Sequence, residues 1–186
     1  YSAQATSGYG LAFKTDGTAM YVLCQSTGSP VKQYTLSIAW DLSTASYASK
    51  SFDTSLGAPS GLFFKSDGTK MYIVDYASDD VKQYSLSTAW DISTASYDSV
   101  NISVSAQDTT PFDLTFSSDG TKMFVVGYTN ETVYQYNLST AWDLSTASYS
   151  GSSFSVSTQD TNPEGIFFKP DGTKMFVLTQ TLDVVF

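Results

Sequence analysis

The sequence contains no histidine, no arginine and a single cysteine, and each absence excludes a kind of function. Without histidine, neither a histidine-based catalytic triad nor a zinc site of the usual kind is expected. The nine basic residues are all lysine, and the net charge is −9. Because nucleic acid and anionic membranes attract basic surfaces, this balance argues against both as partners. No apolar run approaches the roughly 20 residues that span a bilayer, so membrane insertion is not expected.

The single cysteine, Cys24, excludes a disulfide within the chain. It follows the apolar run 20–23, whose pattern is typical of a strand. A reactive thiol needs basic neighbours or a helix N-terminus to lower its pKa, and the sequence offers neither. We therefore predict a buried structural thiol.

Two dipeptides recur at a nearly fixed period. Asp-Gly pairs are spaced 51, 52 and 52 residues apart, and Trp-Asp pairs 50 and 52. A period near 50 built from short apolar alternations is typical of propeller arrays. The sequence therefore predicts an all-β propeller of four-stranded antiparallel blades, about 3.5 of them present. The repeated residues are Asp16-Gly17, Asp67-Gly68, Asp119-Gly120 and Asp171-Gly172, with Trp40, Trp90 and Trp142.

One complete unit, residues 61–97, illustrates the expected strands. The first strand covers 62–64, and an Asp-Gly turn connects it to the second strand, 71–74. The glycine adopts the left-handed backbone conformation that closes the turn. The third, 81–86, alternates in period two, and an irregular edge strand follows Tyr97. In the connection between the third strand and the edge strand, Ser or Thr is expected to cap a short helical turn. The repeated Trp there is interpreted as a packing anchor between blades.

The repeats divide the chain into one expected propeller domain. Four units of about 52 residues would need roughly 208, about 22 more than are present. The absence of an initial Met and of a signal-peptide pattern means that the N-terminus has been processed or that the chain is a piece of a longer one. The shortfall favours a piece of a larger propeller. A four-bladed ring sealed by the two termini and a ring or fibre of several chains are the alternatives. The expected segments are 1–10 (the end of a blade), 11–60, 61–112, 113–164 and the partial blade 165–186.

The pattern F-x-x-D-G-T-K-M-Y/F-V followed by V-x-Q-Y-x-L covers essentially the whole chain. It resembles the β-propeller repeats of the YVTN and NHL-like group, especially those of phage and bacterial surface proteins. The resemblance implies a propeller that serves as a binding scaffold, a structural part or occasionally an enzyme. It supplies no catalytic motif to place on this sequence.

The parity of the strands predicts where recognition occurs. The Asp-Gly turns and Trp-Asp connections, nearly identical in every unit, are expected at one end of the blades. The other connections vary between units and are expected at the opposite end, where loops on a rigid scaffold carry function. They are 25–30, 76–80, 128–131 and 180–183 within the units, and 8–9, 59–60, 111–112 and 163–164 between them. We call that end the variable face. Its candidate contacts are Tyr9, Tyr76, Asp79, Asp80, Tyr128, Asn130 and Glu164.

Enzymatic and metal-binding alternatives rest on few residues. Asp79 and Asp80 are the only adjacent acidic pair, and neighbouring strand residues point to opposite faces, which does not suit glycoside hydrolysis. The same pair is the best candidate for calcium, but no 12-residue ligand loop accompanies it. We therefore expect no cofactor, no metal and no enzyme activity.

Two non-enzymatic functions remain. One is a recognition or adhesion module for a surface glycan or protein receptor, and the other is a structural subunit that associates through blade edges. Ser, Thr, Tyr and Asn are abundant, which favours an extracellular, cell-surface or virion-surface location. Three glycosylation sequons begin at Asn101, Asn130 and Asn137, and Asn130 is preferred because it lies in an expected turn.

Overall fold

The structure, a computed structural model, describes residues 7–159, 161–180 and 185. The described chain is built from antiparallel β-strands joined by short turns and three 3-10 helices. None of the helices in these ranges is long and apolar enough to cross a membrane. The expected end of a blade at 1–10 lies partly outside the described residues, as does the last variable connection at 180–183.

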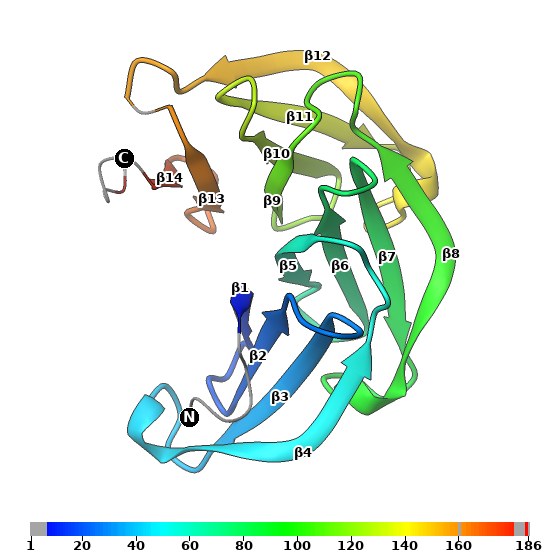
Figure 1. The fold of residues 1–186 in the computed structure, drawn as a ribbon, viewed down its shortest axis with the longest axis vertical. Helices are drawn as coiled ribbons and strands as arrows, with labels where there is room; N and C mark the ends of the chain where they lie inside the picture. The colour runs from blue at the N-terminus through cyan, green and yellow to red at the C-terminus, as the bar shows by residue number, and fades with distance from the viewer. Residues whose placement is uncertain (1–6, 160, 181–184, 186) are drawn as a thin grey trace. The chain divides into compact units, whose positions relative to one another are not determined.

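Each repeat forms one sheet whose strands follow one another in chain order (Figure 1). The three complete sheets have four strands, and the fourth has two described strands. The first contains β1 (Gly8–Phe13), β2 (Ala19–Cys24), β3 (Pro30–Leu36) and β4 (Ala45–Asp53). The second contains β5 (Pro59–Phe64), β6 (Lys70–Asp75), β7 (Asp80–Leu86) and β8 (Ala95–Ser103). The third contains β9 (Pro111–Phe116), β10 (Lys122–Gly127), β11 (Thr132–Leu138) and β12 (Ala147–Ser155), and the last β13 (Pro163–Phe168) and β14 (Met175–Thr179).

The first strand of each sheet begins three residues earlier than expected. In β1, Gly8 pairs with Cys24 and Gly10 with Leu23, so the register shifts by one residue between them. The same shift occurs in β9 and β13. Such a bulge extends the strand through residues that look like a connection. The expected connections 8–9, 59–60, 111–112 and 163–164 therefore lie inside strands, which corrects the prediction.

The Asp-Gly hairpins form as predicted. In the first, Gly17 donates its N–H to the Lys14 carbonyl and has a φ of 73°, which only glycine adopts without strain. The Asp16 carboxylate accepts the N–H of Thr18 at 2.9 Å and its hydroxyl at 2.6 Å. The glycines of the other three turns have the same positive φ. Turn chemistry therefore explains the repeated Asp-Gly pair.

The Trp-Asp connections form 3-10 helices, but aspartate caps them instead of Ser or Thr. The helices are η1 (Leu42–Thr44), η2 (Ile92–Thr94) and η3 (Leu144–Thr146). In each, the carboxylate of the preceding aspartate accepts the N–H of the serine two residues on. Aspartate is as good an N-cap as serine, and here it is the residue with the right backbone conformation. This corrects the predicted cap.

Two compact units divide the chain, and each has its own core. Unit 1 comprises residues 1–73 and 83–99, and unit 2 comprises 74–82 and 100–186. The core of unit 1 packs side chains of the first sheet against those of the second, including Tyr21, Leu23, Leu62, Phe64 and Ile92. The core of unit 2 includes Val126, Val133, Val156, Ile166 and Val177.

The cysteine is buried in unit 1. Cys24 is fully inaccessible to solvent, and burial raises the pKa of its thiol. A raised pKa keeps the thiol protonated and therefore unreactive. The prediction of a buried structural thiol is confirmed.

Candidate functional site

Three aromatic side chains, two from variable connections and one from the start of β9, lie in a row in unit 2. Tyr76 follows β6, Phe112 lies near the start of β9, and Tyr128 follows β10. The rings of Tyr76 and Phe112 are 6.2 Å apart and 6° from parallel, and those of Phe112 and Tyr128 are 6.0 Å apart at 31°. All three are partly exposed. We call Tyr76, Phe112 and Tyr128 the aromatic row.

A buried aspartate fixes the backbone beside the aromatic row. The carboxylate of Asp108, 2% exposed, accepts the N–H of Asn130 at 2.8 Å and that of Thr110 at 2.8 Å. It therefore ties the connection that enters β9 to the turn that follows β10. The Asn130 side-chain amide adds a bond to the Gln107 carbonyl at 2.7 Å. Charge-assisted bonds to backbone N–H groups are strong, so this part of the variable face is held in one conformation.

The turn before β7 is held by a second buried aspartate. Asp80 is 5% exposed, and its carboxylate accepts bonds from the Lys82 ammonium, the Ser78 hydroxyl and the Asn101 amide. Asp79 has a positive φ of 51°, and its carbonyl accepts the N–H of Val104. An ammonium on Asp80 competes with a cation for the same oxygens, which disfavours the calcium hypothesis for this pair. Among the described residues, no group of three or more metal-ligating side chains is present.

An unusual carboxylate lies between β9 and β13. The Asp113 carboxylate accepts the N–H of Ile166 at 3.0 Å. Although the residue keeps some exposure, desolvation of its carboxyl group raises the pKa to about 7, against the lowering effect of bonds from Ile166 and Leu114 N–H. Glu164, on β13, also has a raised pKa because of burial.

The structure brings some of the predicted contacts together and not others. Tyr76 and Tyr128 meet through Phe112, with Asn130 two residues beyond Tyr128. Glu164 lies in β13 and not in a loop, and Asp80 is engaged in holding its own turn. Tyr9, 45% exposed, lies in β1 of unit 1. Ligand contacts by these residues stay a prediction.

The sequons differ in how their amides are used. The amide of Asn101 donates to Asp80 and that of Asn130 to Gln107, whereas the Asn137 oxygen accepts from Gln135. All three residues are exposed, and Asn130 lies in the expected turn. Their glycosylation stays a prediction.

Two residues of the candidate site, both in β9, were not among the predicted contacts. Phe112 completes the aromatic row, but it lies 36 positions from Tyr76, so only the fold brings the rings together. Asp113 did carry a signal. The aligned positions in the other repeats are Gly10, Gly61 and Gly165, so a charged side chain breaks the pattern there.

Comparison with known proteins identifies the fold. No protein-family model and no curated protein matches the chain. A functionally unknown protein from Desulfotomaculum acetoxidans is similar in structure, with a TM-score of 0.65 and 14% identity over 94% of this chain and 49% of that one. A periplasmic gluconolactonase from Pseudomonas aeruginosa gives 0.62 and 12% over 93% and 50%. A β-propeller domain from Myceliophteria thermophila gives 0.59 and 11% over 96% and 52%.

These similarities, with the four-stranded antiparallel sheets, define the class of protein. The chain has the β-propeller fold, with about three and a half blades, and the predicted fold class is confirmed. It spans about half the length of the solved structures it matches. At such identities the likeness concerns the fold alone.

Proposed function

We propose that the chain is a non-enzymatic recognition scaffold that binds a surface glycan through the variable face of unit 2. The aromatic row is the observation that carries this proposal. Tyr and Phe rings offer apolar faces to the C–H groups of a sugar ring, and tyrosine adds a hydroxyl for hydrogen bonding. A protein receptor is the second kind of partner that such a surface suits.

The rigidity of the surrounding backbone supports this proposal. Asp108 and the amide of Asn130 hold the turn that presents Tyr128. A surface ordered before binding loses little conformational entropy when the ligand arrives. Exposed polar groups at the edge of the row, such as Asn130 and Thr129, supply the hydrogen bonds that orient a hydroxylated ligand.

The test is glycan-array binding of the chain followed by titration of the best glycan. Tyr76→Ser and Tyr128→Ser are each expected to weaken binding about tenfold, because one aromatic contact is worth roughly 1–1.5 kcal/mol. Tyr97→Ser is the matched control, since Tyr97 is a 43%-exposed tyrosine on the edge strand β8. Equal affinities for all four proteins would refute the proposed site.

We also propose that the chain has no enzyme activity, on the ground that it has no histidine to act as a general base. Similar structures are named a gluconolactonase and putative 6-phosphogluconolactonases, so hydrolysis of gluconolactone and of 6-phosphogluconolactone are the relevant assays. We expect the rate in buffer to be unchanged by the protein. Faster hydrolysis that is lost in Asp113→Asn, which removes the carboxylate with the raised pKa, would contradict this proposal.

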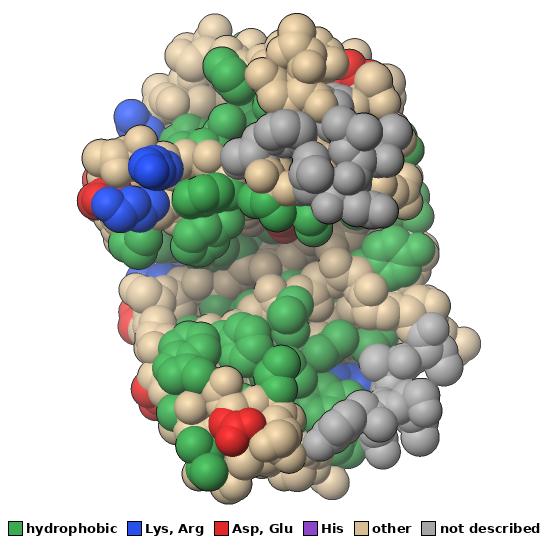
Figure 2. All heavy atoms as spheres, turned by 90° about the vertical axis from the view of Figure 1, so that its left-hand side faces the viewer, with side chains coloured by type: hydrophobic (Ala, Val, Ile, Leu, Met, Phe, Trp, Pro, Cys, Tyr) green, Lys and Arg blue, Asp and Glu red, His purple; other side chains and the backbone are tan. Residues whose placement is uncertain are grey.

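The alternative function is assembly through blade edges, which exposed apolar side chains favour (Figure 2). In unit 1 they lie on β1 and in the connection between β3 and β4, and in unit 2 they lie on β12, β13 and β14. The exposed apolar residues are Leu11, Ile38, Trp40 and Leu42 in unit 1, and Phe154, Phe167, Phe176 and Leu178 in unit 2.

We further propose that the chain is a single propeller domain and forms part of a larger propeller. We expect it to be displayed outside the cell or on a virion, as in the surface proteins whose repeats it resembles.

A further inference from the structure

Within unit 1, the Trp-Asp connection of the second repeat fills the space beside the first sheet. The Trp90 indole lies 5.6 Å from Phe64 of its own sheet and 6.1 Å from Tyr21 of the first sheet. The Tyr21 hydroxyl donates to the Trp90 carbonyl. The indole also covers Gly68 so closely that a Cβ added to that glycine would overlap it.

Two residues further on, Ile92 fills a second space against the same sheet. Ile92 is fully buried, and its N–H donates to the Gln33 side-chain oxygen at 3.1 Å. Between the two, Asp91 forms an ion pair with Lys50 of β4 at 2.6 Å. The segment Trp90–Ile92 therefore makes an apolar, an ionic and a second apolar contact in succession.

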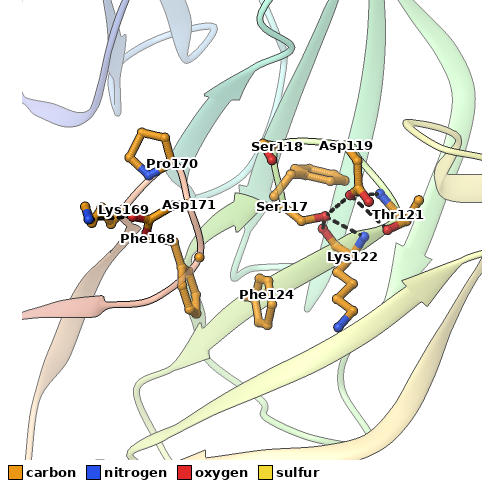
Figure 3. A pocket seen from close by; sticks show the side chains of 12 residues that line it. Ser117, Ser118, Asp119, Thr121, Lys122, Phe124, Phe168, Lys169, Pro170 and Asp171 are labelled. Carbon is orange, nitrogen blue, oxygen red and sulfur yellow. Dashed lines mark hydrogen bonds and ion pairs between the residues drawn. The ribbon is translucent and has the colours of Figure 1, made fainter.

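Unit 2 has aromatic residues at the positions that contact Trp90 in unit 1, but a cavity lies beside them. Phe124 and Phe168 occupy the repeat positions of Tyr21 and Phe64, and the two rings of each pair are 4.5 Å apart. Figure 3 shows Phe124 and Phe168 among the side chains that line the pocket. A cavity of about 440 Å³ adjoins them and reaches Gly172. Among the described residues, nothing lies within 4 Å of a Cβ added to Gly172, whereas at Gly68 the indole occupies that place.

A second cavity adjoins the first at the position that Ile92 takes in unit 1. It measures about 220 Å³ and shares the Phe124 and Phe168 walls. Gln135 and Phe154 line it at the repeat positions of Gln33 and Phe52. Phe52 packs against Tyr84 at 5.6 Å, but Phe154 is 57% exposed.

We propose that the two cavities form a docking socket for a polypeptide segment that carries Trp, then Asp, then Leu or Ile. The occupant is a segment of the repeat's own type, presented by polypeptide outside residues 1–186. Its indole lies over Gly172 in the larger cavity, and its Leu or Ile enters the smaller one beside Phe154. The contacts of Trp90–Ile92 in unit 1 supply the geometry, and the socket is independent of the aromatic row.

The probe is a capped peptide with the sequence of residues 139–149, STAWDLSTASY, titrated into the 186-residue chain by calorimetry. We expect binding that weakens at least tenfold when Ala replaces the peptide's Trp, and severalfold when Ser replaces its Leu. In the protein, Gly172→Asn is expected to weaken binding at least tenfold, because asparagine tolerates a positive φ while its side chain enters the socket. Tyr97→Ser, which removes an exposed aromatic ring on β8 in unit 1, is the control that leaves affinity unchanged.

A gain of affinity tests the same geometry without risk to folding. Ser152 occupies the repeat position of Lys50 and lines the smaller cavity. Ser152→Lys is expected to tighten binding about threefold by recreating the Lys50–Asp91 ion pair, an effect that salt screens. A peptide with Asn in place of Asp should show no gain. Ser148→Lys adds the same charge to β12 outside the socket and should not tighten binding.

A short peptide loses much conformational entropy on binding, so a tethered form complements it. The same segment is joined to the C-terminus through a Gly/Ser linker of about 15 residues, which raises its effective concentration. The melting temperature is expected to rise for this fusion and not for the one whose Trp is replaced by Ala. No rise in the tethered form, or binding that is indifferent to Gly172→Asn, would overturn the proposal. A dimer of the 186-residue chain that Phe154→Ser abolishes would overturn it too, since a second copy would then be the occupant.

Discussion

At the scale of single residues, the glycine of each Asp-Gly turn meets two demands. Its φ lies near +73°, a conformation that costs other residues roughly 1 kcal/mol. In the first three repeats its missing side chain also leaves room for an indole, which a Cβ would overlap. At Gly172 only the first demand applies.

A matched pair of substitutions distinguishes the cost of the positive φ from the cost of displacing the indole. Gly172→Ala is expected to lower the free energy of unfolding by about 1 kcal/mol, from backbone strain alone. Gly68→Ala is expected to lower it by about 3 kcal/mol, because the Trp90 indole must also move. Urea unfolding followed by circular dichroism measures both, and equal losses would show that the indole yields without cost.

A second residue-scale effect concerns Asp113, whose carboxyl group is desolvated between β9 and β13. Its pKa is raised from 3.8 to about 7. Between these values the native state holds a proton that the unfolded chain has released, so the free energy of unfolding falls as the pH rises from 4 to 8. The stabilising contribution of this group is present below about pH 4 and lost through pH 7.

The variant Asp113→Asn removes this titration and keeps an oxygen that accepts the Ile166 N–H. We expect the variant and the original chain to be about equally stable at pH 4. At pH 8 the variant should be more stable, by on the order of 2 kcal/mol once partial exposure is allowed for. Thermal unfolding at several pH values measures the difference. A difference that stays constant from pH 4 to pH 8 would mean that Asp113 ionises normally.

At the scale of elements, the Trp-Asp connection shows that one repeated motif has two environments. Trp90 packs between Tyr21 of the first sheet and Phe64 of the second. Trp40 contacts Phe13 of its own sheet at 5.5 Å and is 60% exposed. The interpretation of the Trp as an anchor between blades therefore holds for Trp90, where the neighbouring sheet is present in the same unit.

Alanine substitutions test how much the neighbouring sheet contributes. Trp90→Ala is expected to lower the free energy of unfolding by about 3 kcal/mol, as is usual for a packed aromatic side chain. Trp40→Ala, at the same position of the repeat, is expected to cost about 1 kcal/mol because little area is lost. Guanidinium unfolding of the two variants provides the comparison. A cost for Trp40→Ala as large as that for Trp90→Ala would contradict the difference in packing.

Elements that depend on the preferences of neighbouring residues could be predicted from the sequence, and elements that depend on contacts between strands could not. The Asp-Gly hairpins follow from the φ preference of one glycine, so sequence alone predicts them. The early starts of β1 and β9 depend on bulges, which form between strands and leave no local pattern. In the candidate site, turn position was enough to suggest Tyr76 and Tyr128. Their link through Phe112 needed the fold, because the three rings come from two connections and from strand β9, far apart in the sequence.

At the scale of the whole molecule, exposed apolar surface and net charge have opposite effects on self-association. Large apolar side chains lie exposed in both units (Figure 2). Ile38, in the connection after β3, is 60% exposed, and Phe167, in β13, is 59% exposed. Apolar patches of this kind usually mark surfaces that another polypeptide covers. The net charge of −9 repels like copies and limits association at low ionic strength.

We therefore expect the 186-residue chain to self-associate at micromolar concentrations, and more strongly as salt screens its charge. The double variant Ile38→Ser with Phe167→Ser should shift association to about tenfold higher concentration, because it removes exposed apolar area from both units. Tyr97→Ser, which removes an exposed aromatic ring from the edge strand β8, is the control and should leave association unchanged. Light scattering across a range of protein and salt concentrations gives the mass directly. A mass of 20.1 kDa under all conditions would show that the charge outweighs the apolar surface and that these surfaces need a different polypeptide to cover them.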